Sequence, residues 1–168
     1  NNGPLRGGKG DGWEGGLRVP AVMQWPGTIP AGSVSKASGV HFDLFSTILD
    51  AAGTNIPDTN GRLSVDGISL LDHLQSGGKN PLPDRTLFFD LWGKQAAIHG
   101  PWKIVADTGN HNGKFDKAVS AAKAADYMLV NLDHDLSETT NLKDKHPEIY
   151  KDLKEQFVKW LSKASDYN

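Results

Sequence analysis

The chain has 168 residues, 38% of them hydrophobic, which is enough for one globular core with a smaller appended unit. Its 18 Lys and Arg residues nearly balance 20 Asp and Glu residues, and a formal net charge of -2 does not indicate nucleic acid or an anionic membrane as a partner. The absence of Cys excludes disulfides and thiolate chemistry within these residues, and no apolar run approaches the ~20 residues of a membrane span.

The N-terminal third predicts a loop, a strand and a helix in that order. Residues 1–18 are so rich in glycine that neither a helix nor a regular strand is expected there. The apolar run 19–25 ends in a Pro-Gly pair, which predicts a buried strand closed by a turn. Apolar residues recur at three- and four-residue steps over 42–52, and Gly53 follows, so a helix is predicted there.

The remainder predicts a small antiparallel sheet with helices. Residues 54–67 are rich in Pro, Asn, Asp and Gly, which favours a linker, and we place a domain boundary between residues 56 and 57. A short helix over 68–75 follows. Four β-prone runs then predict the strands, namely 86–92, 95–98, 102–105 and 127–131.

Two further segments complete the predicted C-terminal unit. Residues 106–125 are polar and then rich in Ala and Lys, which predicts an exposed loop with a short helix around 117–124. Residues 147–163 begin with Pro and carry one apolar stripe, so they predict a helix that covers one face of the sheet. The fold class predicted from these elements is α+β.

The chemically informative stretch is residues 4–20, where cations, acids and a Trp are held in a glycine-rich backbone. Glycine allows the backbone to approach a ligand closely, and Lys9 offers a point charge with three donors suited to a sulfate or phosphate oxygen. Taken alone, the pattern is more typical of a solvated surface lysine.

This stretch resembles the sulfatase family, whose pattern here is L-R-G-G-K-G, then E-G-G and R-x-P, then W-P-G. The likeness continues along most of the chain in the same order. The matching positions are residues 5–10, 14–16, 18–20 and 25–27, then 43–53 (D-x-x-P-T-I-L-x-x-A-G), 66–70 (D-G-x-S-L), 102–105 (W-K-L-V) and 129–142 (L-Y-D-L-x-x-D-P-x-E-x-x-N-L). Ser46 stands where the family has Pro, and Val130, Asn131 and Leu136 also depart from the pattern.

The resemblance implies the C-terminal part of an alkaline-phosphatase-like α/β sulfatase, in which Lys9 contacts the sulfate. It implies a formylglycine nucleophile and one calcium ion, and the motifs for both are missing from these residues, so both are expected outside this chain. No metal ligand is assigned here, and the chain alone is expected to be inactive. Residues 1–56 would be the tail of the catalytic domain and residues 57–168 a C-terminal subdomain with the small sheet.

Three further residues are candidates for contact with the substrate. Trp13 lies close to Lys9 in the sequence and could form a wall for a sugar or aryl group, although packing is an equal interpretation. Trp92 and Lys94 lie at the end of a predicted strand, at a place where relatives of the sulfatase family often present substrate-binding side chains. His41 and His73 have no partner at catalytic spacing, so they are interpreted as capping or surface residues.

The implied substrate is a sulfated small molecule or glycan, and the implied location of the whole protein is periplasmic or extracellular. Nucleic acid and a membrane span are not expected. Self-association is an expectation as well, because an uncovered apolar strand tends to pair with another copy. Two alternatives stay open: a phosphate or phosphonate ester hydrolase of the same superfamily, and a non-catalytic carbohydrate-binding module with exposed Trp residues.

Overall fold

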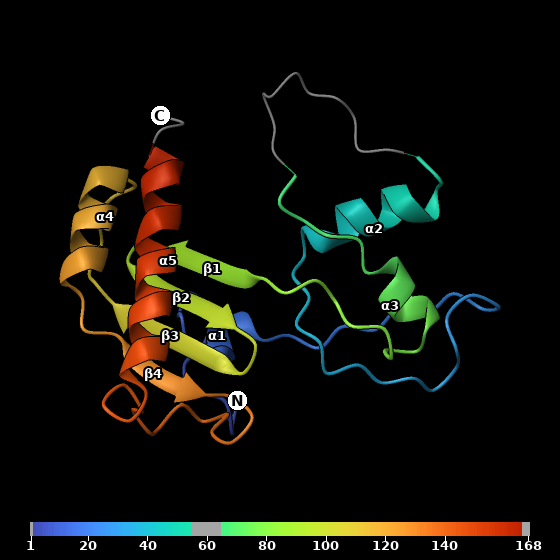
Figure 1. The fold of residues 1–168 in the computed structure, drawn as a ribbon, viewed down its shortest axis with the longest axis horizontal. Coiled ribbons are helices and arrows are strands. Elements are labelled where there is room, and N and C mark those ends of the chain that lie inside the picture. Colours follow the sequence, from blue (N-terminus) through green and yellow to red (C-terminus); the bar gives the residue numbers. More distant parts are fainter. Residues whose placement is uncertain (1, 55–64, 166–168) are drawn as a thin grey trace. The chain divides into compact units, whose positions relative to one another are not determined.

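The computed structural model describes residues 2–54 and 65–165, which form two compact units (Figure 1). One unit combines Asn1–Pro20 with Asp84–Asn168, and the other is Ala21–Pro83. The glycine-rich N-terminal segment is therefore part of the same unit as the C-terminal sheet. The boundary predicted between residues 56 and 57 lies outside the described residues, and the assignment of 1–56 to a catalytic domain stays a prediction.

The first unit is built on a four-stranded antiparallel sheet with strand order β1-β2-β3-β4. The strands are β1 (Thr86–Leu91), β2 (Lys94–His99), β3 (Trp102–Asp107) and β4 (Met128–Asn131), and all four predicted strands are confirmed. β1 and β2 are joined by Trp92 and Gly93 alone, which have φ values of 52° and 91°. Positive φ at both positions is typical of the two-residue turn that matches the right-handed twist of paired strands.

Helices α4 (Phe115–Ala124) and α5 (Pro147–Ser165) cover one face of this sheet (Figure 1). Leu153, Phe157 and Leu161 recur every four residues on α5, so they lie on one side of it and are buried in the core. Ile104 and Leu129 meet them from the sheet. The predicted C-terminal helix is confirmed.

Residues 106–125 are less exposed than the sequence predicts. The expected short helix is formed as α4, but it lies alongside α5 and its Ala118 and Ala122 are fully buried. Alanines at i and i+4 lie on one face of a helix and allow a close approach to a neighbouring helix. Composition indicated the helix, whereas this packing depends on α5, about 30 residues away.

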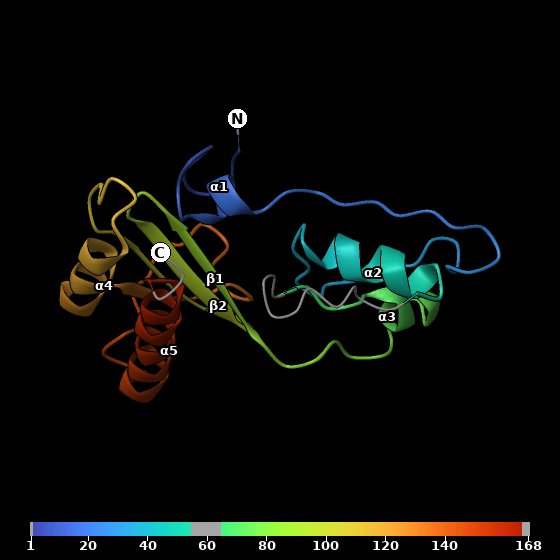
Figure 2. The same cartoon turned by 90° about the horizontal axis from the view of Figure 1, so that it is seen from above.

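The N-terminal segment covers the opposite face of the sheet, as Figure 2 shows from above. β2 is buried from Gln95 to Ile98 without alternation, which requires cover on both faces. Gly12 provides part of that cover, because a Cβ placed on it would lie 3.3 Å from the Gln95 carbonyl oxygen. The segment also contains one helical turn, α1 (Glu14–Leu17), so the expectation of no helix was wrong.

The second unit contains α2 (Asp43–Ala51) and α3 (Leu71–Gln75), which confirms both predicted helices. The strand predicted over 19–25 is wrong, because these residues form no strand and Val19 and Val22 are exposed. No strand among the described residues pairs with them. An apolar run becomes a strand only where a partner satisfies its backbone groups.

Helix α2 buries its polar side and exposes its apolar side. Its buried residues are Asp43, Ser46 and Thr47, whereas Phe45 and Ile48 are exposed. Thr47 Oγ1 accepts the Leu70 amide at 2.9 Å, and Ser46 Oγ donates to the Gly67 carbonyl at 2.8 Å. The hydroxyl that replaces the family's Pro at position 46 therefore ties α2 to the D-G-x-S-L segment.

Candidate functional site

Lys9 lies on a loop that is closed at its base by the chain's own backbone. The Gly15 amide donates to the Arg6 carbonyl at 2.7 Å, and the Asp11 amide donates to the Gly8 carbonyl at 2.9 Å. Asp11 Oδ2 also accepts the Gly8 amide at 2.9 Å. The Lys9 side chain is exposed and, among residues 2–54 and 65–165, forms neither a hydrogen bond nor an ion pair.

Two glycines at the base of the loop are required by close contacts. A Cβ on Gly15 would lie 2.4 Å from the Gly7 carbonyl oxygen and 2.5 Å from that of Arg6. A Cβ on Gly16 would lie 2.3 Å from the Asp11 carbonyl oxygen. Because such distances are far inside van der Waals contact, the E-G-G part of the family pattern has a steric reason here.

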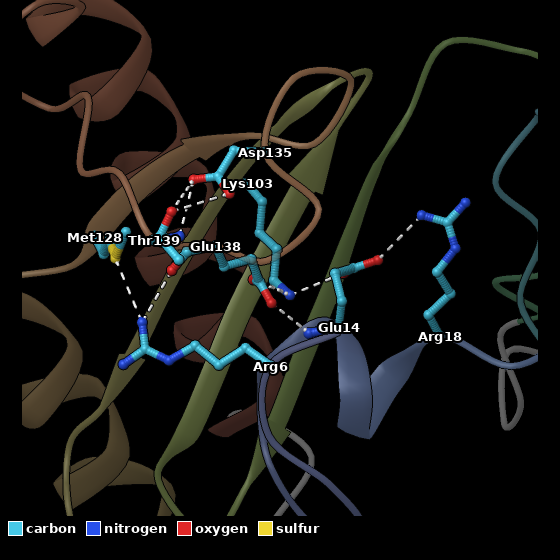
Figure 3. Close-up of polar contacts among 8 residues, drawn as sticks. All are labelled: Arg6, Glu14, Arg18, Lys103, Met128, Asp135, Glu138 and Thr139. Carbon is cyan, nitrogen blue, oxygen red and sulfur yellow. Dashed lines mark hydrogen bonds and ion pairs between the residues drawn. The ribbon is translucent and has the colours of Figure 1, made fainter. Parts of the chain in front are cut away.

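A buried charge cluster holds this loop to the sheet (Figure 3). The fully buried Lys103 Nζ lies 2.9 Å from Glu14 Oε1 and 2.8 Å from Glu138 Oε1. The first contact is a hydrogen bond, and the second is an ion pair whose angle falls outside hydrogen-bond geometry. The Glu14 amide donates to Glu138 Oε2 at 2.6 Å. One ammonium thus joins two carboxylates that come from different segments.

Arg6 forms a second link between the loop and the turn after β4. Its Nη1 donates to the Glu138 carbonyl at 2.9 Å and points toward the Met128 sulfur at 4.0 Å (Figure 3). Its guanidinium carbon lies 3.6 Å from the centroid of the Trp13 ring, in a cation–π contact. One face of Trp13 is therefore covered by Arg6, while the residue also lines a groove of about 440 Å³ beside α4.

The turn that supplies Glu138 is held in an unusual backbone conformation. Glu138 has φ 53°, in the left-handed region that non-glycine residues seldom adopt. Asp135 Oδ2 accepts the amides of Thr139 and Thr140, each at 2.8 Å. Burial opposes ionisation of Asp135, but these hydrogen bonds, with Thr140 first, lower its pKa below the ordinary range.

The β1–β2 turn presents the other two candidate residues. Trp92 occupies the first turn position and is 64% exposed. Lys94 forms an ion pair with Asp107, its partner across β2 and β3. The hydrogen bond to Asp107 raises the pKa of Lys94 above its ordinary value, against a smaller opposing effect of burial. The negative charge of Asp11, in the Lys9 loop, adds a smaller contribution in the same direction.

A buried His–Asp pair stands behind that turn. His111 Nε2 lies 2.9 Å from Asp90 Oδ2, and Asp90 Oδ1 accepts the Gly93 amide at 3.1 Å. The Thr108 amide donates to the Gly93 carbonyl at 2.8 Å. His111 lies in the segment 106–125, which the sequence predicts as an exposed loop, and its link to Asp90 arises only when the hairpin and this segment fold together.

His73 is structural, although it is buried rather than capping or on the surface. It lies 2.7 Å from Ser35 Oγ through Nε2 and 2.5 Å from the Asn80 carbonyl through Nδ1. His41 is exposed. Within the described parts of the chain, His, Asp and Glu side chains form no group of three or more that could hold a metal ion.

The residues of the charge cluster were missed by sequence reasoning. Glu14 belongs to the E-G-G motif, Lys103 to W-K-L-V, and Glu138 to the pattern over 129–142. Each motif was noted separately, and their convergence is a result of the fold. A lysine between Trp102 and Ile104 in a strand was the one available indication, because a charge in an apolar run needs a buried partner.

Comparisons with known proteins find sulfatases among the similar sequences. A family model described as Sulfatase matches residues 1–54. A Formosa agariphila protein described as Sulfatase is 31% identical over 148 residues, which cover 88% of this chain and 26% of the relative. Homo sapiens N-acetylgalactosamine-6-sulfatase is 36% identical over 115 residues, which cover 68% of this chain and 19% of the relative. The chain therefore spans about a quarter or less of the length of these relatives.

The fold has counterparts among solved structures. The crystal structure of Ps i-CgsB in complex with k-i-k-neocarrahexaose superposes with a TM-score of 0.70 and 25% identity, covering 96% of this chain and 32% of that chain. The α+β fold predicted for the C-terminal part of an alkaline-phosphatase-like sulfatase is confirmed. Within the described residues, no helix is both long and apolar enough to cross a membrane. From the glycine-rich loop to the terminal helix, the chain is similar in sequence and fold to the C-terminal part of sulfatases.

Proposed function

We propose that the whole protein hydrolyses sulfate esters and that Lys9 contacts the sulfate group. The observation that carries this proposal is the state of the Lys9 ammonium. It is exposed at the tip of a closed loop and has no partner within the described residues. Lys94, the other candidate lysine, is already paired with Asp107 and is less available to an anion.

The chemistry assigned to Lys9 is electrostatic. An ammonium with three donors can hydrogen-bond to a non-bridging sulfate oxygen and offset negative charge that develops on the bridging oxygen as the ester bond breaks. A preorganised donor of this kind contributes about 10²-fold or more to the rate. The loop closure between Gly15 and Arg6 would hold the backbone of Lys9 in place, and the bound sulfate would order its side chain.

The proposed substrate is a sulfated small molecule or a glycan. The similar structure of Ps i-CgsB holds k-i-k-neocarrahexaose, which supports an oligosaccharide. Trp92 is the stronger of the two aromatic candidates for a sugar contact, because it is 64% exposed whereas one face of Trp13 is stacked by Arg6. Lys94 would contribute through its carbon stem or after exchange of its Asp107 partner.

Formylglycine and calcium complete the proposal for the whole protein. The similarity to sulfatases implies a nucleophile and a metal, and the described residues offer no group of carboxylates and histidines that fits a metal. Formylglycine would supply the nucleophile and calcium would bind the anion, and both are assigned to parts outside this chain. The isolated chain is accordingly expected to be inactive, and the whole protein is placed in the periplasm or outside the cell.

The test replaces Lys9 in the complete enzyme and measures hydrolysis of para-nitrophenyl sulfate, with para-nitrophenyl phosphate in parallel. Lys9→Ala should lower kcat/KM for the sulfate by roughly 10²-fold or more, because it removes charge stabilisation and leaves the packing unchanged. Lys117→Ala is the matched control, since Lys117 is an exposed lysine on α4. If Lys9→Ala lowered kcat/KM by less than about threefold, Lys9 would be an ordinary solvated surface residue. If the wild-type enzyme hydrolysed the phosphate ester faster than the sulfate ester, the proposed sulfate specificity would be wrong.

A further inference from the structure

We propose that Glu14, Lys103 and Glu138 are positioning residues that set the place of the Lys9 ammonium without touching the ester themselves. This inference rests on the proposed function, because it assigns the cluster a part in sulfate binding. Lys103 and Glu138 are fully buried and Glu14 is 5% exposed. The three side chains contain one positive and two negative charges in a part of the unit closed to water.

Stability alone does not account for such a cluster. Removing charges from water costs several kcal/mol each, and well-packed apolar side chains of similar volume are often at least as stabilising as a buried ion pair. A buried charge group does differ from an apolar contact in one respect. It is satisfied in few geometries, so it fixes the register between the segments that it joins.

The segments joined here are the sheet and the two ends of the Lys9 loop. Arg6 and Glu14 lie on either side of Lys9 in the chain, and the Gly15–Arg6 hydrogen bond brings the two ends of the loop together. Both ends are attached to Glu138, through its carbonyl from Arg6 and through Oε2 from the Glu14 amide. A shift of Glu138 would therefore move the base of the loop, and Lys9 would move with it.

The backbone of Glu138 supports a positioning role. Its φ of 53° is a strained conformation for a residue with a side chain, and such strain persists only where the surroundings determine it fully. The contacts that do so include Arg6 and the Glu14 amide, both from the Lys9 segment, and Lys103 from β3. These contacts lie on the face of the sheet away from α5, so the core can form without them.

The deciding experiment is a double-mutant cycle between Lys9 and Glu138 in the complete enzyme with para-nitrophenyl sulfate. Glu138→Ala alone should lower kcat about 10-fold or more and change KM less, because a misplacement of about 1 Å can cost up to roughly 10²-fold. In the Lys9→Ala background the same substitution should cost less than about threefold, since its effect passes through Lys9. Glu138→Gln, which keeps an acceptor for the Glu14 amide, should fall between wild type and Glu138→Ala.

Two controls separate positioning from general stability. Leu161→Ala removes a core side chain on the opposite face of the sheet and should leave kcat within about threefold at a temperature below its melting transition. In the 168-residue chain, Glu138→Ala should speed hydrogen exchange of the amides over residues 7–16 and leave that of Ile104 in β3 unchanged.

The possible outcomes distinguish a failure of the positioning role from a failure of the role of Lys9. An equal loss from Glu138→Ala in the wild-type and Lys9→Ala backgrounds would overturn the positioning role and leave the role of Lys9 standing. A loss below threefold from Lys9→Ala would overturn the role of Lys9 and this inference together. If Glu138→Ala fails to fold in the complete enzyme, Glu138→Gln in both backgrounds and the exchange measurement on the chain decide the matter by the same criteria.

Discussion

Gly15→Ala is expected to open the Lys9 loop without unfolding the unit. The new Cβ would lie 2.4 Å from the Gly7 carbonyl oxygen and 2.5 Å from that of Arg6, and both belong to the backbone, so neither can rotate away. Moving them costs about 1–3 kcal/mol, as overpacking does elsewhere. The shift also breaks the hydrogen bond from the Gly15 amide to the Arg6 carbonyl, worth about 1 kcal/mol.

Together these effects favour the open loop by roughly 2–4 kcal/mol, which corresponds to about 30-fold or more in the open population. Hydrogen exchange measured by NMR on the 168-residue chain reports this opening directly. The amides of Asp11 and Gly16 should exchange about 30-fold faster or more, whereas that of Ile104 in β3 should be unaffected.

Gly8→Ala is the matched control in the same loop. Gly8 does not have positive φ, and a Cβ on it would meet only the flexible Asn2 side chain, at 3.6 Å. Its effect should stay within about 1 kcal/mol. If Gly15→Ala left the loop amides as slow as in the wild type, or if Gly8→Ala accelerated them equally, the steric argument for the glycines would be refuted.

Two further predictions concern single polar groups. Thr47→Val keeps the side-chain shape but removes the acceptor of the Leu70 amide, so hydrogen exchange of the α2 amides should show a loss of stability of about 1–3 kcal/mol. Thr47→Ser keeps the acceptor and should avoid this loss. Equal losses of stability in both variants would contradict the prediction. The Asp135 carboxylate has a folded-state pKa below its ordinary 3.8, so its stabilising effect is complete above about pH 4 and is lost as the pH falls through the folded-state value. Thermal unfolding between pH 2 and 6 should therefore show a shallower acid dependence in Asp135→Asn than in the wild type.

Much of the fold was predictable because its elements carry local patterns. The α5 helix combines an initial Pro with an apolar stripe, and β1, β3 and β4 contain short apolar, β-branched or aromatic runs. Each of these patterns is complete within about 20 residues. The Lys9 loop was also located from sequence, through its glycines and its likeness to the sulfatase pattern.

The incorrect predictions concern elements whose conformation or orientation depends on a partner segment elsewhere in the chain. The period of α2 predicted a helix correctly, but its apolar side is exposed and Asp43 is fully buried, because polar contacts to 67–70 decide the orientation. The run 19–25 lacks a pairing strand among the described residues and stays irregular. Local composition contains no information on either partner.

In the candidate site, too, features determined by neighbouring residues could be predicted, whereas contacts between distant segments could not. The position of Lys9 on a loop could be read locally, whereas the cluster of Glu14, Lys103 and Glu138 depends on three segments that meet only in the folded unit. Trp92 was correctly placed at the end of a strand, and the buried His111–Asp90 pair behind it was not foreseen. The contacts of Trp92 and Lys94 with a substrate stay predictions.

The long sequence separations within the cluster have a consequence for the order of folding. The Glu14 amide reaches across 124 positions to Glu138, and Lys103 reaches across 89 to Glu14, whereas the β1–β2 hairpin closes over 14 residues. Because the entropy cost of closing a chain grows with its length, the hairpins should form early and the N-terminal segment should dock late. The lysine proposed to contact sulfate would then reach its place only after the sheet has formed. Binding of an anion at Lys9 would therefore show that this unit has finished folding.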